Sequence, residues 1–125
     1  MTTAEIEREI GLRAELGHDA GSRRFTPAGD QLSGHYEETY CYFDFGRSES
    51  LAQLIRESVE AIRDRVEFLT RLRGTGGSVE VYVSWFGKRR NFGESLDYEL
   101  LRDLAHLGLD LALDVYAADR ASTLR

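Results

Sequence analysis

The stretch from Ser50 to Gly74 constrains the fold more than any other part of the chain. Its apolar side chains recur at steps of three or four residues, at Leu51, Ile55, Val59, Ile62, Val66 and Leu69. Such steps place one stripe along the face of an α-helix. Ser50 and Gln53 have the spacing of a capping box, and Gly74 fits the left-handed residue beyond a helix end. We therefore predict one long helix, about 35 Å at 1.5 Å per residue, which can cover a whole small sheet.

The size and charge of the chain narrow the fold and the partners. It has 125 residues and a net charge of −6, which predicts a single domain that needs no metal or disulfide to bury its core. The negative charge disfavours nonspecific binding to nucleic acid or anionic lipid, and it favours binding to a cationic partner. Cys41 is the only cysteine, so no disulfide within the chain is possible. With neither a signal-like N-terminus nor a membrane-length apolar run, we expect a cytoplasmic protein without membrane contact.

Periodicity and turn residues predict the remaining elements in order. They are a helix at 3–16 that Gly11 weakens or ends early, a long loop at 17–34, a strand at 36–45, the long helix, strands at 79–86 and 92–96, a helix at 98–107, a strand at 109–116 and a frayed tail at 117–125. Alternation turns Cys41, Phe43 and Phe45 towards the long helix. The 17–34 loop is read either as a binding loop or as a mobile connection.

This order indicates an α+β fold of ferredoxin-like type. From residue 36 onward the elements run β-α-β-β-α-β, the split βαβ arrangement. A mainly antiparallel four-stranded sheet would carry helices on one face and leave the other face partly open, and the helix at 3–16 would be an N-terminal addition.

Two segments resemble a known family. The run from Leu96 to Leu101, with the strand from Leu107 to Tyr116, is similar to the end of the bacterial domain of unknown function numbered 4279. Residues 5–12 resemble the first helix of that family. The resemblance implies an α+β fold and a bacterial or phage origin, and it brings no activity, cofactor or catalytic residue. Members usually carry a strand before the first helix, whereas only three residues precede Ala4. Either the chain start is trimmed or one sheet edge is unfilled, so the sequence does not decide on which edge a partner could pair.

The sequence shows no recognisable catalytic chemistry. The three histidines, His18, His35 and His106, lack a second ligand at metal spacing. The glycine-rich run from Gly74 to Gly77 follows a helix and precedes a strand, the reverse of a phosphate-binding loop. No serine lies in a nucleophile elbow. We therefore predict no catalytic residue, no metal and no cofactor, and the protein is not expected to be an enzyme.

Two groups of surface residues remain as candidate sites. The first is the open sheet face, predicted to bind a partner through Tyr40, Tyr42, Asp44, Glu80, Tyr82, Asp110, Asp114 and Tyr116. Tyrosine is enriched at interaction hot spots, and acids steer a basic partner. The alternative for this face is an ordinary solvated surface whose tyrosines pack across strands. The second group could bind an anion and consists of Arg23, Arg24, Lys88, Arg89 and Arg90.

These features lead to two functional hypotheses. The first is a non-catalytic interaction module for a basic protein partner, for example an immunity or counter-defence protein that acts by occlusion. The immunity or counter-defence role rests on analogy with small acidic bacterial proteins. The alternative is a small-molecule or nucleotide-binding protein that uses the 17–34 loop and the basic residues. Pairing with a second copy of the chain, as a homodimer, is left open.

Overall fold

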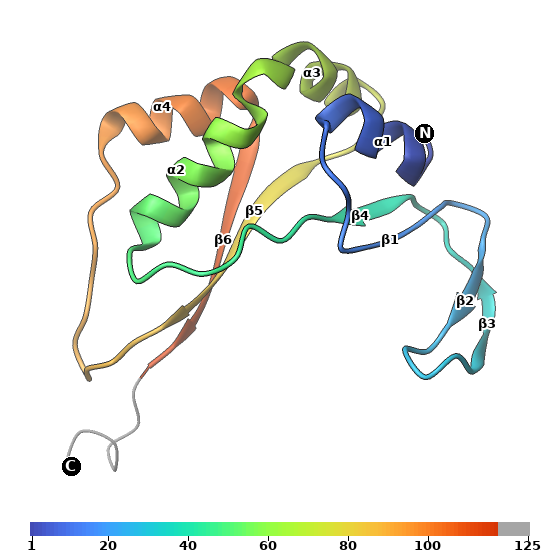
Figure 1. The fold of residues 1–125 in the computed structure, drawn as a ribbon, viewed down its shortest axis with the longest axis horizontal. Helices are drawn as coiled ribbons and strands as arrows, with labels where there is room; N and C mark the ends of the chain where they lie inside the picture. The colour runs from blue at the N-terminus through green and yellow to red at the C-terminus, as the bar shows by residue number, and fades with distance from the viewer. Residues whose placement is uncertain (118–125) are drawn as a thin grey trace. The chain divides into compact units, whose positions relative to one another are not determined.

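The chain forms two compact units, Met1–Asp44 and Phe45–Arg125, and each is considered by itself. The computed structural model describes residues 1–117 (Figure 1). The predicted C-terminal tail lies outside the described residues, apart from Ala117. That the whole chain folds as a single domain stays a prediction.

The N-terminal unit opens with a short helix, α1 (Thr3–Ile10). Its N-cap is Thr2, whose hydroxyl accepts a hydrogen bond from the Glu5 amide at 3.2 Å, while the Glu5 carboxylate accepts one from the Thr2 amide at 2.9 Å. This reciprocal pair is a capping box. The helix ends at Gly11, where φ is +80°. The prediction that extended it to residue 16 was therefore too long, and the glycine ends it early.

The segment predicted as a long loop instead contains strands. The N-terminal unit holds β1 (Leu16–His18), β2 (Arg23–Phe25), β3 (Gln31–His35) and β4 (Tyr40–Tyr42). β1 pairs antiparallel with β4, and β2 with β3. β1 to β3 are short and mostly exposed, so they carry no apolar alternation that sequence analysis could detect. The strand predicted at 36–45 is reduced to the three residues of β4.

The predicted packing of Cys41 on the long helix stays a prediction, because the two belong to different units. Cys41 lies half-buried in β4 of the N-terminal unit. Burial raises the pKa of its thiol, and the nearby charges of Glu7 and Asp19 raise it further. Both of these carboxylates belong to the N-terminal unit.

The predicted long helix is present but interrupted in the second unit. It consists of α2 (Leu51–Ile62), a 3₁₀ turn η1 (Arg63–Arg65) and α3 (Val66–Gly74). Ile62 has φ −122° and ψ 10°, outside the helical region, which breaks the hydrogen-bond ladder. The predicted N-cap is confirmed, because the Ser50 hydroxyl accepts from the Gln53 amide at 3.1 Å. The reciprocal half of a capping box is not formed, because the Ser50 amide donates to the Ser48 hydroxyl at 3.1 Å and not to the Gln53 side chain. Gly74 is the last residue of α3, and the left-handed glycine beyond it is Gly76, with φ +90°.

A β-α-β unit completes the second unit. β5 (Val79–Phe86), α4 (Tyr98–Leu107) and β6 (Leu109–Tyr116) match three predicted elements. The Asp97 side chain caps α4 by accepting from the Leu100 amide at 2.9 Å, and Gly108 ends the helix with φ +69°. β5 and β6 are direct parallel neighbours, in register from Val79 opposite Leu109 to Phe86 opposite Tyr116.

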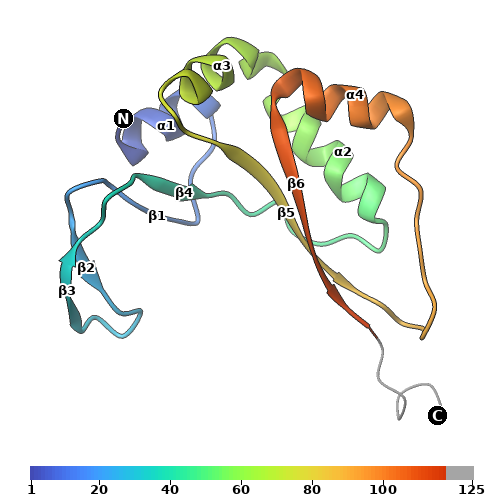
Figure 2. The same ribbon diagram turned by 180° about the vertical axis from the view of Figure 1, so that it is seen from behind.

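The helices cover one face of the β5–β6 pair. Figures 1 and 2, which are opposite views, show α2 and α4 on the same side of the two strands. Ile55, Val59 and Leu69 are the largest fully buried side chains. The core of this unit also contains Leu51, Ile62, Phe68, Val83, Leu100, Leu104, Leu107 and Leu109.

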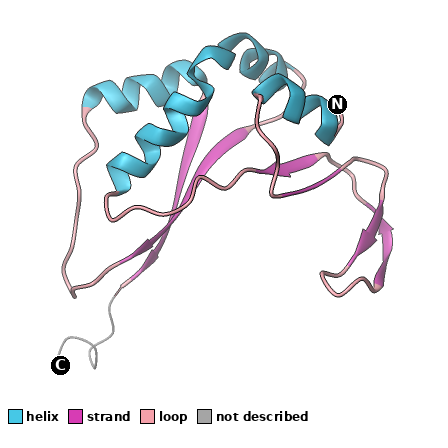
Figure 3. Cartoon of the chain, viewed as in Figure 1, coloured by secondary structure: helices cyan, strands magenta, loops and turns pink. Residues whose placement is uncertain are grey.

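The α+β class is confirmed, whereas the ferredoxin-like arrangement is not. The described residues form three two-stranded sheets and no four-stranded antiparallel sheet. The strand predicted at 92–96 is absent from the described structure, and residues 87–97 instead form a long connection (Figure 3). Among the contacts of this connection, the Phe92 ring meets Trp85 edge-on at 4.9 Å, and Glu94 binds the start of α2. The chain thus crosses to a parallel neighbour and does not turn back as a hairpin.

Candidate functional site

The uncovered face of the β5–β6 pair is the candidate site. Side chains alternate along each strand, so every second residue points away from α2 and α4. We call this surface the acidic tyrosine face; it comprises Glu80, Tyr82, Ser84 and Phe86 from β5 and Asp110, Ala112, Asp114 and Tyr116 from β6.

Large aromatic side chains on this face stay in contact with solvent. The exposed fractions are 53% for Tyr82, 67% for Phe86 and 48% for Tyr116. The Phe86 and Tyr116 rings stack with centroids 4.7 Å apart and planes 11° from parallel. They form a flat aromatic surface at the ends of the two strands.

A single carboxylate orients both tyrosines. Oδ2 of Asp114 accepts a hydrogen bond from the Tyr82 hydroxyl at 2.7 Å and another from the Tyr116 hydroxyl at 2.8 Å. The hydrogen bond from Tyr82, followed by that from Tyr116, lowers the pKa of Asp114. The hydrogen bond to Asp114 is also the largest cause that raises the pKa of Tyr82 and the pKa of Tyr116. At neutral pH the cluster therefore holds a charged carboxylate and two neutral hydroxyl donors.

The face carries negative charge without a compensating cation of its own. Glu80 and Asp110 are register partners on adjacent strands, which lie about 4.8 Å apart. Like charges placed side by side in this way are destabilising. Neither strand contains Lys, Arg or His. Among the described residues, no ion pair reaches Glu80, Asp110 or Asp114.

The structure brings together five of the eight predicted partner-binding residues. These are Glu80, Tyr82, Asp110, Asp114 and Tyr116. The other three do not share their sheet, because Tyr40 and Tyr42 lie in β4, which pairs with β1 in the N-terminal unit, and Asp44 is the last residue of that unit. A binding surface made of all eight residues stays a prediction. Sequence analysis missed Phe86 as a site residue, although its alternation with Tyr82 and Ser84 is the signal that reveals it.

Tyr40 takes part in an aromatic stack that sequence analysis missed. The His18 ring stacks with the Tyr36 ring at 3.5 Å and 7° and with the Tyr40 ring at 5.6 Å and 26°. The Arg24 guanidinium lies over the Tyr36 ring at 6.0 Å. His18, Arg24 and Tyr40 come from β1, β2 and β4, and Tyr36 directly follows β3, so only the pairing of these short strands reveals the stack. Its contacts give Tyr36 and Tyr40 a packing role within the N-terminal unit.

The five basic residues proposed to bind an anion are divided between the two units. Arg23 and Arg24 belong to β2 of the N-terminal unit, and residues 88–90 follow β5 in the second unit. Two of the five also have contacts with neighbouring residues. Arg24 donates to the Ser33 carbonyl at 3.4 Å, and the Lys88 ammonium lies 3.2 Å from the Glu49 carboxylate.

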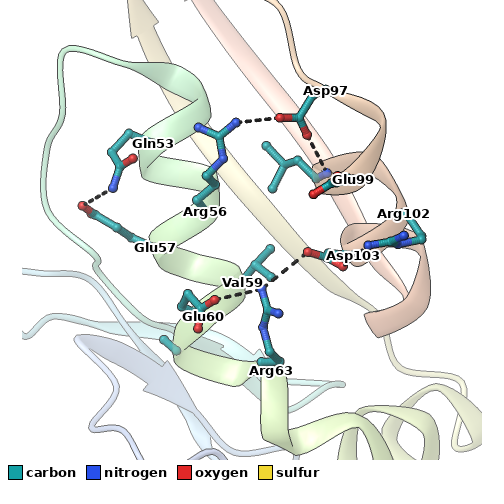
Figure 4. A pocket seen from close by; sticks show the side chains of 12 residues that line it. Gln53, Arg56, Glu57, Val59, Glu60, Arg63, Asp97, Glu99, Arg102 and Asp103 are labelled. Carbon is teal, nitrogen blue, oxygen red and sulfur yellow. Dashed lines mark hydrogen bonds and ion pairs between the residues drawn. The ribbon is translucent and has the colours of Figure 1, made fainter.

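An open groove of about 730 Å³ runs between α2 and α4 (Figure 4). The buried side chains of Val59 and Leu100 contribute to its lining. Two ion pairs cross it, from Arg56 to Asp97 at 2.9 Å and from Arg63 to Asp103 at 3.4 Å. The arginine Nη atoms thus reach Asp97, which caps α4, and Asp103 within α4, so ion pairs of the chain itself bridge the groove. The seven-residue spacing of the two arginines within the predicted long helix is the sequence signal for these ion pairs.

The described residues contain no group of three or more His, Cys, Asp or Glu that could hold a metal ion. None of the helices in the described part of the chain combines the length and the apolar character that crossing a membrane requires.

No protein-family model, curated protein or solved structure matches the chain.

Proposed function

We propose that this protein is a non-catalytic interaction module that binds a basic protein partner through the acidic tyrosine face. The observation that carries the proposal is the composition of that face: exposed aromatic rings beside three carboxylates, on two strands without any cation. Tyrosine supplies contact area at a small entropic cost. The carboxylates would attract a basic surface and speed its encounter with the face.

The mechanism is occlusion, with electrostatic complementarity and no covalent step. A role as an immunity or counter-defence protein in the cytoplasm is a special case of this proposal and rests on analogy. Membership of the bacterial family of unknown function numbered 4279 likewise stays a prediction. The alternative, nucleotide binding through residues 17–34 and the basic residues, has less support because that segment pairs into strands and its cations lie in separate units.

The test reverses charge on the face and measures association. The double variant Asp110→Lys, Asp114→Lys, used beside the wild type, should recover less of a basic partner captured from the native host. With the captured partner, the association rate should fall about tenfold or more at low salt, and the difference should shrink as salt screens the charges. The control is Asp64→Lys, which changes an exposed acid in η1. Association kinetics and salt dependence equal to those of wild type in the double variant would show that this face is not the interface.

A further inference from the structure

The aromatic part of the acidic tyrosine face is held in a fixed orientation. Tyr82 and Tyr116 come from different strands, and both donate to Asp114. Phe86 stacks on Tyr116. A partner group that lands on these rings therefore does not have to order them first, which reduces the entropic cost of binding.

Asp114 keeps hydrogen-bonding capacity for an incoming donor. Both tyrosine hydroxyls donate to Oδ2, and no hydrogen bond from another described residue reaches Oδ1. An ionised carboxylate offers about four lone-pair sites. The two hydroxyls are neutral donors, so they orient the carboxylate without neutralising its charge. A cationic donor can thus bind Asp114 beside exposed aromatic rings.

Of the two basic side chains, arginine fits this combination better. Its guanidinium is planar and weakly hydrated, it stacks on aromatic faces, and it donates in a fork that matches a carboxylate. The lysine ammonium is compact and strongly hydrated, so it loses more hydration on a ring surface. The flat Phe86–Tyr116 stack, with both rings about half exposed or more, suits the planar group.

We propose that the face recognises arginine side chains of its partner, with one guanidinium lying between Asp114 and the rings of Tyr82, Phe86 and Tyr116. This inference rests on the proposed function and narrows the chemistry of the partner. Asp110 is four residues from Asp114 on the same strand, a separation of about 13 Å. A second arginine about that far from the first would reach Asp110 and its neighbour Glu80.

The test compares two capped peptides that differ only in the basic residue. One extended Gly/Ser peptide carries two arginines four positions apart, and the other carries lysines at the same positions. Binding to the full chain is followed by the shifts of backbone amide NMR signals at low salt. The arginine peptide should bind about fivefold more tightly or better, with the largest shifts at residues 80–86 and 110–116.

Variants locate the recognition on the face. Phe86→Leu and Tyr82→Phe should each reduce the preference for arginine, and Asp114→Asn should weaken the binding of both peptides, whereas Asp64→Asn should change neither. Each variant is checked for native secondary structure by circular dichroism. Equal binding of both peptides at the face would overturn arginine recognition and leave the proposed function standing. Peptide binding at another surface, or no peptide binding, would also overturn arginine recognition. The association kinetics of the Asp110→Lys, Asp114→Lys variant test the proposed function separately.

Discussion

Glu94 connects the long β5–α4 connection to the first turn of α2, and its replacement is the most informative stability test. Its Oε1 accepts from the Ser50 hydroxyl at 2.7 Å and from the Ala52 amide at 2.9 Å, and its Oε2 accepts from the Leu51 amide at 2.9 Å. These amides are among the donors that a helix leaves unpaired at its N-terminus. The carboxylate also meets the positive end of the helix dipole.

The size of the effect follows from these contacts. Loss of a capping side chain costs about 0.5–2 kcal/mol, and loss of an anion at a helix N-terminus costs about 0.3–1 kcal/mol. Because Glu94 is exposed, solvent screening keeps the total below the sum of the two upper values. We expect Glu94→Ala to lower the free energy of unfolding by about 1.5 kcal/mol and Glu94→Gln by about half as much. Since Ser50 still caps Gln53, α2 itself should persist.

The contribution of Glu94 to stability should depend on pH in a definite direction. The hydrogen bond from Ser50, followed by that from the Ala52 amide, lowers the pKa of Glu94 below its ordinary value of 4.5. A carboxylate with a lowered folded-state pKa stabilises the protein above the ordinary value and loses that contribution as pH falls through the folded-state pKa. The stability difference between wild type and Glu94→Gln should therefore be full at neutral pH and disappear in acid.

Urea unfolding followed by two signals measures this effect. Circular dichroism reports the helices, and fluorescence reports Trp85, the only tryptophan, whose ring contacts Phe92 in the same connection. Glu38→Gln is the matched control, because Glu38 is exposed outside the helices and strands. If Glu94→Gln and Glu38→Gln have equal midpoints at every pH, the carboxylate does not hold the connection and the reasoning is refuted.

Three further predictions address the face, the core and a helix end. The pKa values of Tyr82 and Tyr116 are raised by Asp114, so two of the six tyrosines should ionise late in an ultraviolet titration and return towards normal in Asp114→Asn; unchanged titration would contradict the hydrogen bonds. This contribution to stability is present below the ordinary tyrosine pKa and is lost as pH rises through the raised values. Ile55→Ala removes a side chain with 0% exposure and should cost about 2–5 kcal/mol in urea unfolding, whereas a loss under about 1 kcal/mol would argue against a packed core. Gly108→Ala forces a left-handed residue with φ +69° and should cost about 1–2 kcal/mol, and a thermal midpoint equal to that of wild type would count against this cap.

Elements with local signals were predictable from the sequence. The helix at 98–107 agrees with α4 because Asp97 and Gly108 mark its ends and its leucines have helical spacing. The strand at 109–116 agrees with β6 because apolar and polar residues alternate along it. In both cases the signal lies within a few residues of the element that it defines.

Features that depend on distant contacts were not predictable. Nothing within 92–96 reveals that Glu94 binds α2 and Phe92 packs on Trp85, and those contacts replace the expected hairpin with a long connection. The strands β1 to β3 are polar and short, so hydrogen bonding between strands defines them without an apolar pattern. The apolar stripe continues in the sequence across residues 63–65, so it did not reveal the break between α2 and α3.

The same distinction applies to the candidate site. The two-residue period of a strand fixed which side of β5 and β6 each residue occupies, and so five site residues were placed on one face. The sheet partner of β4 depends on long-range pairing, which placed Tyr40 and Tyr42 in a sheet with β1 and not in the sheet of β5 and β6.

An ordinary solvated face and a docking face make different demands on these residues. Solvation alone gives no reason to place Glu80 beside Asp110 without a cation on either strand, since like charges in register oppose strand pairing. Cross-strand packing explains the Phe86–Tyr116 stack, yet it leaves both rings about half exposed or more. A basic, arginine-bearing partner would offset the repulsion and cover the rings together. A solvated face would need a separate explanation for the charge repulsion and for the exposed rings, whereas docking of one partner explains both, and we therefore favour docking.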